Sequence, residues 1–267
     1  MSGVKDRTER RPETDNASDP KSPHASRLTP HAALVIFAKA PIPGQVKTRL
    51  CPPLTPDEAA TLHGSFVLDT LERTKMAASK LKLPIDRYLA CAPSVTHVFF
   101  KIMEERQSVK LIDQVGDDLG ARMNQAFRTL FAQGYRQVFL MGTDVPTLPF
   151  DHFTQALTSL ENHDLVLGPA FDGGYYLIGL KRTAPELFAD IPWSTERVLR
   201  LTQEKAAGIG LKASLIQPWR DVDTLADLEA IIEACAAEAK KPKTERSFSA
   251  RTTGVLELLA KRLRTRA

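Results

Sequence analysis

Strand-like and helix-like segments alternate along this chain from residue 33 to residue 239, and this alternation limits the folds that it can adopt. Apolar runs of strand length occur at 33–39, 85–91, 109–112, 137–142, 164–168, 174–180 and 212–216. Helical patterns fill the gaps at 56–78, 96–105, 119–131, 150–160, 194–207 and 224–239. Strands separated by helices need crossover connections, which build a mostly parallel sheet covered by helices on both faces. The sequence therefore predicts a single doubly wound α/β domain over residues 32–239.

The composition is that of a globular protein, with 43% hydrophobic and 25% charged residues in a chain of 267. We find no apolar run of about 18 residues, so we predict no membrane span. Residues 1–31 have almost no large apolar side chains and lack the apolar segment of a signal peptide. We therefore expect a disordered N-terminal extension and a cytoplasmic protein.

The net charge of +4 is unevenly distributed. Residues 240–267 contain nine Lys or Arg and two Glu, a net charge of +7, and residues 1–31 add +1, which leaves −4 for the body at 32–239. This acidic balance argues against a nucleic-acid-binding body. The basic tail contains a short amphipathic helical pattern at 255–264, which could rest on a partner or an anionic surface, but we expect a solvated, frayed end.

A loop rich in Pro and Gly follows the first apolar run and brings three cationic residues close together, Lys39, Lys47 and Arg49. Ligands of α/β sheets bind beyond the carboxyl ends of the strands. Gly44 lets the backbone approach a ligand, and the cationic side chains suit phosphate oxygens. The spacing matches neither a P-loop nor a dinucleotide-binding loop. We predict a nucleotide phosphate site of another kind, the alternative being an ordinary basic surface loop.

Carboxylates follow two later strands of the predicted sheet. Asp144 follows the run at 137–142 and is expected at the same edge as the basic loop. Asp221 and Asp223 follow the run at 212–216, and an extended Asp-x-Asp segment can direct two carboxylates towards one cation. Carboxylates are the usual protein ligands of hard divalent cations. A turn or N-cap role is the alternative for Asp144, and capping of the last helix is the alternative for Asp223.

The segment 168–176 joins two apolar strands through a turn that contains Asp172 and two glycines. Asp-Gly is a strong turn pair, so we predict a hairpin. A turn alone does not require Gly174, Tyr175 and Tyr176 as well, and the combination suggests a wall against which a substrate ring lies. Asp172 would then orient or deprotonate an acceptor hydroxyl.

With these motifs, residues 33–234 resemble a bacterial family of GT-A-like transferases labelled radical-SAM/selenodomain-associated transferase type 1, which is described as glycosyltransferases. The resemblance rests on motifs at 37–50, 118–123, 142–146, 168–180, 193–194 and 221–224. It implies the nucleotide-diphospho-sugar transferase fold, whose first half binds a nucleotide and whose second half binds the acceptor. The first loop is also similar to that of the 2-phospholactate guanylyltransferases.

The resemblance also implies a role for each candidate site residue. The nucleotide-binding set is Lys39, Gly44, Lys47, Arg49 and Asp118, although a helix cap is the default role of Asp118. The acceptor-binding set is Gly173, Gly174, Tyr175 and Trp193. Asp144, Asp221 and Asp223 would bind Mg or Mn, and the catalytic set is Asp144, Asp172 and Lys47.

Three functions fit these motifs. The leading one is metal-dependent glycosyl transfer from a nucleotide sugar to a small-molecule acceptor. The second is nucleotidyl transfer from a nucleoside triphosphate such as GTP to a phosphorylated small molecule, although the chain lacks the Leu-Ala-Gly-Gly-x-Gly-x-Arg-Met loop of the sugar-phosphate nucleotidyltransferases. The third is nucleotide binding without catalysis. Where glycosyltransferases have Asp-x-Asp, this chain has Gly142-Thr143-Asp144, with one Asp only. The sequence does not indicate an oligomeric state.

Overall fold

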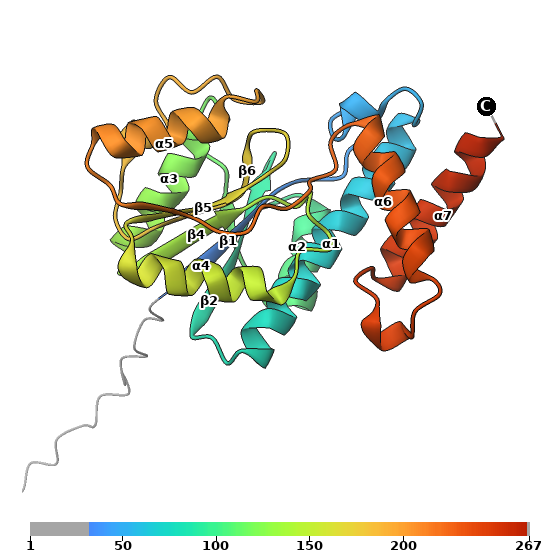
Figure 1. The fold of residues 1–267 in the computed structure, drawn as a ribbon, viewed down its shortest axis with the longest axis horizontal. Helices are drawn as coiled ribbons and strands as arrows, with labels where there is room; N and C mark the ends of the chain where they lie inside the picture. Colours follow the sequence, from blue (N-terminus) through green and yellow to red (C-terminus); the bar gives the residue numbers. More distant parts are fainter. Residues whose placement is uncertain (1–31, 266–267) are drawn as a thin grey trace, which may run out of the picture.

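One seven-stranded sheet runs through the protein, as shown by a computed structural model that describes residues 32–265 (Figure 1). The strands are β1 (Ala32–Lys39), β2 (Ile85–Ala92), β3 (Lys110–Asp113), β4 (Gln137–Met141), β5 (Leu165–Pro169), β6 (Tyr175–Leu180) and β7 (Ala213–Leu215). Their order in the sheet is β3-β2-β1-β4-β6-β5-β7. Only β6 among these strands runs antiparallel to its neighbours. The predicted mostly parallel α/β fold is confirmed.

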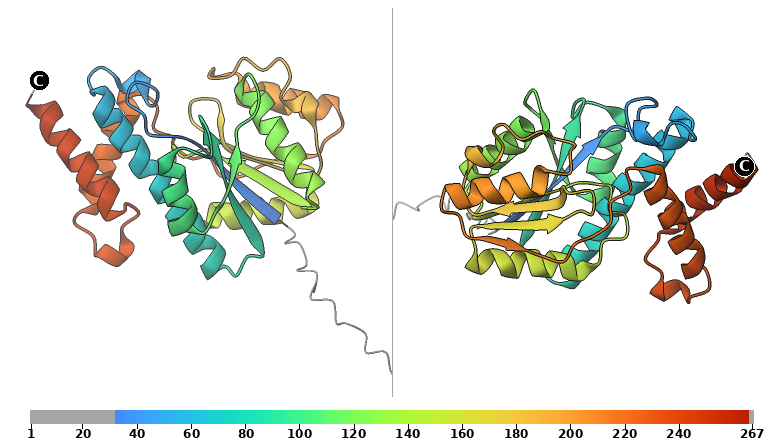
Figure 2. Two further views of the ribbon diagram at one scale, coloured as in Figure 1. Left: turned by 180° about the vertical axis from the view of Figure 1, so that it is seen from behind. Right: turned by 45° about the horizontal axis from the view of Figure 1, so that its top comes forward.

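Helices cover both faces of the sheet (Figures 1 and 2). They are α1 (Pro56–Lys80), α2 (Val98–Gln107), α3 (Leu119–Ala132), α4 (Phe150–Asn162), α5 (Val198–Gly208), α6 (Leu225–Glu238) and α7 (Ala250–Arg264), with short 3-10 turns η1 (Thr48–Leu50), η2 (Pro185–Leu187) and η3 (Lys243–Glu245). Leu34 and Ile36 of β1 face α1, α2 and α4, while Ala33 and Val35 face α3 and α5. Because both faces of β1 are buried, its sequence is a continuous apolar run rather than an alternating one.

Two helices begin at residues that the sequence marks clearly. Thr55 accepts a hydrogen bond from the backbone N–H of Glu58, whose side chain accepts one from the Thr55 N–H. Thr224 and Asp227 form the same reciprocal pair at the start of α6. Each pair satisfies two backbone donors that have no partner inside the helix.

The C-terminal helices α6 and α7 lie beyond α1, on the side away from the sheet (Figures 1 and 2). Leu256 and Leu259 of α7 are buried in a cluster with residues of α1, η1 and α6. Asp69 of α1 accepts hydrogen bonds from the hydroxyls of Ser249 and Thr252 at the start of α7. The expectation of a solvated end is therefore wrong for residues 250–264, because an apolar stripe and a buried carboxylate hold this helix against α1.

Most predicted boundaries lie close to the observed ones, but α5 begins at Val198, four residues later than expected. Ser194 has a left-handed backbone, with φ of 64°, and the Thr195 hydroxyl donates to the carbonyl of Pro192. These turn contacts keep 194–197 out of the helix. The predicted extension at 1–31 and residues 266 and 267 lie outside the described residues. Within the described chain, no helix has both the length and the apolar character to cross a membrane.

Candidate functional site

Two adjoining cavities open at the edge of the sheet where β1 and β4 end. The inner cavity, of about 320 Å³, lies between β4, β6, α3 and the start of α5. The loop cavity, of about 420 Å³, lies beside the basic loop after β1. They share the lining residues Phe37, Arg49, Leu119, Gly142, Asp144, Ser194 and Asp223. A ligand in one cavity therefore lies next to a ligand in the other.

Lys47 lies between two carboxylates at this edge. Its Nζ is 2.7 Å from Asp144 Oδ1 and 2.8 Å from Asp223 Oδ1, and it donates to the carbonyl of Val222. The side chain is only 3% exposed. Burial lowers the pKa of Lys47, but the two carboxylates outweigh it and hold the pKa above its ordinary value. The three ammonium donors thus have three protein acceptors, and the phosphate-binding role of Lys47 stays a prediction.

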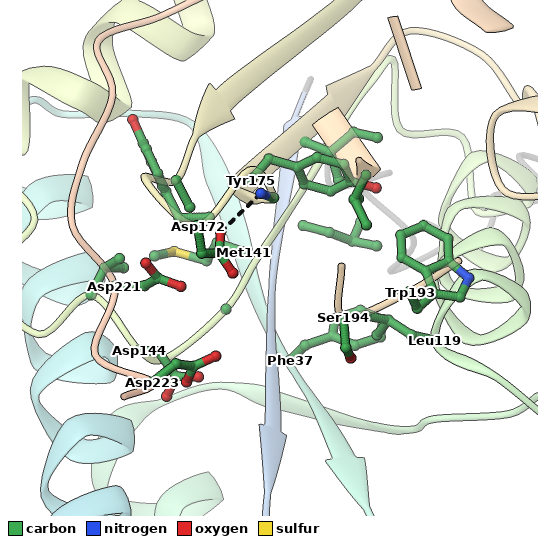
Figure 3. A pocket seen from close by; sticks show the side chains of 18 of the residues that line it. Phe37, Leu119, Met141, Asp144, Asp172, Tyr175, Trp193, Ser194, Asp221 and Asp223 are labelled. Carbon is green, nitrogen blue, oxygen red and sulfur yellow. Dashed lines mark hydrogen bonds between the residues drawn. The ribbon is translucent and has the colours of Figure 1, made fainter. Parts of the chain in front are cut away.

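Three carboxylates converge beside this ion pair. Asp172, Asp221 and Asp223 each offer an oxygen within 4.8 Å of the others. Figure 3 shows Asp172 and Asp221 facing the same space, with Asp144 and Asp223 next to them. Burial and the charges of Asp172, Asp223 and Asp144 raise the pKa of Asp221 to about 7. Burial is the larger cause of this raised pKa, and repulsion from the neighbouring carboxylates adds to it.

The set of converging carboxylates differs from the one expected from the sequence. Asp172 joins Asp221 and Asp223 in this group. Asp144 lines both cavities but lies against Lys47. We refer to Asp172, Asp221 and Asp223 as the acidic cluster.

Local contacts explain why residues from distant segments meet here. The predicted hairpin of β5 and β6 is confirmed, and its turn is closed by the Gly174 N–H, which donates to Asp172 Oδ1 at 2.8 Å. The segment before α6 lies along the end of β5, since the Trp219 N–H donates to the Pro169 carbonyl. The Val222 N–H donates to the Asp144 carbonyl at 3.0 Å. These bonds place the acidic cluster on adjoining backbone segments.

The other residues of the basic loop lie in different surroundings. Arg49 is 62% exposed, lines both cavities and lies 3.9 Å from Asp223. Lys39 lines the loop cavity. Gly44 has a left-handed backbone at φ of 77° but does not line either cavity. Arg49 and Lys39 are thus the loop cations that can reach a bound anion.

Two residues predicted to contact ligands, Asp118 and Gly173, line neither cavity and have structural contacts, and their ligand-binding roles stay predictions. Asp118 is the N-cap of α3 and accepts a hydrogen bond from the Ala121 N–H at 2.7 Å. Gly173 has φ of 88°, and a Cβ there would overlap the backbone of Glu196. Its lack of a side chain lets the hairpin approach the segment before α5. Gly174, Tyr175 and Trp193 do line the inner cavity.

One residue of the loop cavity was missed by the sequence reasoning. The side-chain amide of Gln114 donates to the carbonyls of Ala38 and Ala90, at 3.1 and 2.8 Å. These two bonds orient the amide, and within residues 32–265 its Oε1 has no hydrogen-bond donor. Gln114 lines the loop cavity, where that oxygen can accept a hydrogen bond from a ligand. A single polar residue after a short strand gives no sequence signal for this role.

Comparisons with known proteins identify the family. The pattern of a family described as "Uncharacterized protein conserved in bacteria (DUF2064)" matches residues 75–195. A crystal structure from Desulfovibrio desulfuricans G20, provisionally described as a nucleotide-diphospho-sugar transferase, is 33% identical. The match covers 88% of this chain and 97% of that one, with a TM-score of 0.75. This chain belongs to the DUF2064 family. No curated protein sequence matches it.

Two more distant structures share the fold of this DUF2064 protein. A cytidylyltransferase from Leptospira borgpetersenii serovar Hardjo-bovis is 15% identical, with 87% of this chain and 94% of that one covered and a TM-score of 0.50. The 4-diphosphocytidyl-2C-methyl-D-erythritol synthase of Anaerococcus prevotii is 12% identical, with 79% and 99% covered and a TM-score of 0.50. At these identities, the likeness establishes the fold alone.

The donor set of the DUF2064 protein fits a hard divalent cation. Mg and Mn prefer oxygen ligands, and the acidic cluster offers carboxylate oxygens from Asp172, Asp221 and Asp223 at close range. A cation would relieve the repulsion that raises the pKa of Asp221. The chemistry of the cluster is therefore compatible with the predicted cofactor.

Proposed function

We propose that this protein is a metal-dependent glycosyltransferase that moves a sugar from a nucleotide donor to a small-molecule acceptor. The observation that carries the proposal is the acidic cluster, which adjoins both cavities: Asp223 lines both, and Asp172 and Asp221 line the inner one. Because of this arrangement, a cation bound by the acidic cluster would lie beside substrates in both cavities. The description of the D. desulfuricans relative supports the same reaction class.

The loop cavity is proposed to bind the nucleotide. Arg49 and Lys39 line it and can donate to phosphate oxygens. The oriented Oε1 of Gln114 can accept a hydrogen bond from an N–H of the base. Lys47, with its donors occupied by Asp144, Asp223 and Val222, holds these segments in place.

The inner cavity is proposed to bind the acceptor. Asp172 lines it, and because the Gly174 N–H occupies Oδ1, the second oxygen can accept a hydrogen bond from an acceptor hydroxyl. Mg or Mn held by Asp221 and Asp223 of the acidic cluster would neutralise negative charge on the leaving diphosphate, and this leaves the second oxygen of Asp172 for the acceptor hydroxyl. Arg49 on the rim adds a positive charge from the protein itself.

Nucleotidyl transfer from a nucleoside triphosphate is the second candidate. It is favoured by the fold shared with the two cytidyl-transferring proteins of known structure. Attack at an α-phosphorus needs the same charge neutralisation by a cation and by loop residues. The missing Gly-rich loop argues against it.

The test is thermal unfolding of the protein with nucleotide sugars and nucleoside triphosphates, each with and without Mn. Ligand at 100 Kd should stabilise the fold by about 2.7 kcal/mol. We expect a Mn-dependent shift with one nucleotide sugar, lost in Asp223→Asn and retained in Asp117→Asn, whose carboxylate is exposed. A shift confined to a triphosphate, with pyrophosphate released when an acceptor is added, would favour the second candidate. Binding without turnover would favour a non-catalytic protein, and the absence of any shift would contradict both transferase proposals.

A further inference from the structure

The two ends of the inner cavity differ in chemistry. The acidic cluster and Asp144 line one end, and Figure 3 shows Leu119 and Trp193 on the opposite side. Apolar side chains of the lining gather around Trp193. Met123, Leu140 and Ile178 belong to one apolar cluster with Tyr175 and Trp193. Val198, the first residue of α5, also lines the cavity.

Three polar side-chain groups at this apolar end, those of Thr195, Trp193 and Tyr175, are either hydrogen-bonded or buried. The Thr195 hydroxyl donates to the Pro192 carbonyl at 2.7 Å. The indole Nε1 of Trp193 is buried against Gly120 of α3, where even a Cβ would come within 2.8 Å of it. The Tyr175 hydroxyl is buried beside Thr202. Within the described residues neither the Trp193 Nε1 nor the Tyr175 hydroxyl has a hydrogen-bond partner, but both atoms are buried. The exposed Ser194 side chain also makes no hydrogen bond within residues 32–265.

This lining discriminates between classes of acceptor. A polyhydroxylated molecule would bring several hydroxyls to the apolar end, where buried polar groups without hydrogen bonds are unfavourable. An apolar body would instead gain from leaving water. The volume of about 320 Å³ is at the small end for ligand cavities, so the body is of the size of one ring or a short branched chain.

We propose that the acceptor is an alcohol with an apolar ring or branched aliphatic body rather than a sugar, with its body against Trp193 and Val198 and its hydroxyl at Asp172. The proposal rests on the proposed transferase function. In the reaction, the acceptor oxygen bonds to the anomeric carbon and the bond from that carbon to the diphosphate oxygen breaks. The nucleoside diphosphate leaves with the electron pair, and the hydroxyl proton passes to the Asp172 carboxylate.

The first experiment measures binding rather than turnover. The chain has two tryptophans, so Trp219→Phe leaves Trp193 as the fluorophore in the inner cavity. The probes are cyclohexanol and myo-inositol, which have the same ring but differ in hydroxyls. We expect cyclohexanol to shift the Trp193 emission in a saturable way, and myo-inositol to leave it unchanged at the same concentration. Equal or tighter binding of myo-inositol would overturn the proposal.

A pair of matched variants tests where the alcohol binds. Val198→Thr, made on the Trp219→Phe background, adds a hydroxyl at the apolar end with little change in volume. Val98→Thr makes the same change at the first residue of α2, where the side chain is 68% exposed. We expect cyclohexanol affinity to fall at least fivefold in the first variant and to stay unchanged in the second. Leu119→Ser, at the exposed start of α3, should also reduce the affinity for cyclohexanol. This variant keeps the test valid if the fold does not tolerate the change at Val198.

The same proteins separate the two proposals. If Mn and a nucleotide sugar stabilise the protein but cyclohexanol does not bind, the acceptor class is wrong and the transferase proposal stands. If cyclohexanol binds at Trp193 but no nucleotide donor does, the cavity assignment stands and the transferase function fails. Unchanged cyclohexanol affinity in both Val198→Thr and Leu119→Ser would place the alcohol elsewhere and overturn the inference.

Discussion

Lys47 Nζ lies 2.7 Å from Asp144 Oδ1, so a buried cation ties the first loop to the end of β4. The same ammonium lies 2.8 Å from Asp223 Oδ1, before α6. Three segments that are distant in the sequence thus share one charge at the edge of the sheet. The contact stabilises the fold and also offsets part of the negative charge around the acidic cluster.

Lys47→Met should destabilise the protein by roughly 2–3 kcal/mol, because two carboxylates lose their counter-charge. The value is below that of a fully buried pair, since Asp144 and Asp223 are 37% and 33% exposed. Urea denaturation of the variant and the wild type measures this loss of unfolding free energy. Arg49→Met is the control, because this exposed guanidinium 3.9 Å from Asp223 should contribute less than about 1 kcal/mol. Equal losses in the two variants would contradict the structural role of Lys47.

Gly173→Ala should disturb the inner cavity. Its φ of 88° disfavours any side chain, and a Cβ would also overlap the backbone of Glu196, so the hairpin and the segment before α5 must separate. Gly134→Ala is matched for backbone strain at φ of 92° but has open space around the Cβ. We expect a red shift of Trp193 emission in Trp219→Phe/Gly173→Ala, and none in Trp219→Phe/Gly134→Ala. Identical spectra would show that the close approach is not needed.

Leu256→Ala should cost on the order of 3 kcal/mol of unfolding free energy, since this side chain of α7 is 1% exposed in the cluster with α1 and α6. Leu258 on the same helix is 71% exposed. Leu258→Ala should change stability by no more than about 0.5 kcal/mol. Chemical denaturation of both variants checks the prediction, and a negligible effect of Leu256→Ala would mean that α7 does not dock in solution.

Burial lowers the pKa of His152 and of His63 in the folded protein. When the pH falls below 6.5, the ordinary pKa of histidine, these imidazoles take up protons more readily in the unfolded chain than in the folded protein. The two histidines therefore lower the free energy of unfolding as the pH falls through 6.5. Asp221, with its raised pKa of about 7, acts in the opposite direction in the same range. The informative quantity is therefore the difference between variants.

When the pH falls from 7.5 to about 5.5, the unfolding free energy of His152→Leu should change in the stabilising direction relative to that of the wild type. The reason is that one buried imidazole, which costs stability in this range, is gone. The measurement is the free energy of unfolding at both pH values, relative to the wild type. Thr154→Ala, at an exposed position of the same helix, removes no titratable group, so it serves as the control and should keep the wild-type dependence. A His152→Leu protein with an unchanged pH dependence would rule out this contribution.

Much of the fold can be predicted from this sequence because its signals are local. Apolar runs mark β1 and β4, and the capping pairs at Thr55 and Thr224 mark the starts of α1 and α6. The α5 boundary was missed because the left-handed Ser194 has no signature of its own. The docking of α7 was missed because Asp69, its buried partner, lies in a distant helix.

The sequence by itself determined the alternation of strands and helices and placed Asp144, Asp172, Asp221 and the basic loop near strand ends. Only the tertiary structure decided the strand order β3-β2-β1-β4-β6-β5-β7, in which the second strand of the predicted hairpin lies between β4 and β5. It also decided that Asp172 converges with Asp221 and Asp223 while Lys47 lies against Asp144. The physical reason is that these contacts join residues far apart in the chain. They depend on how whole elements pack, and local periodicity does not encode this.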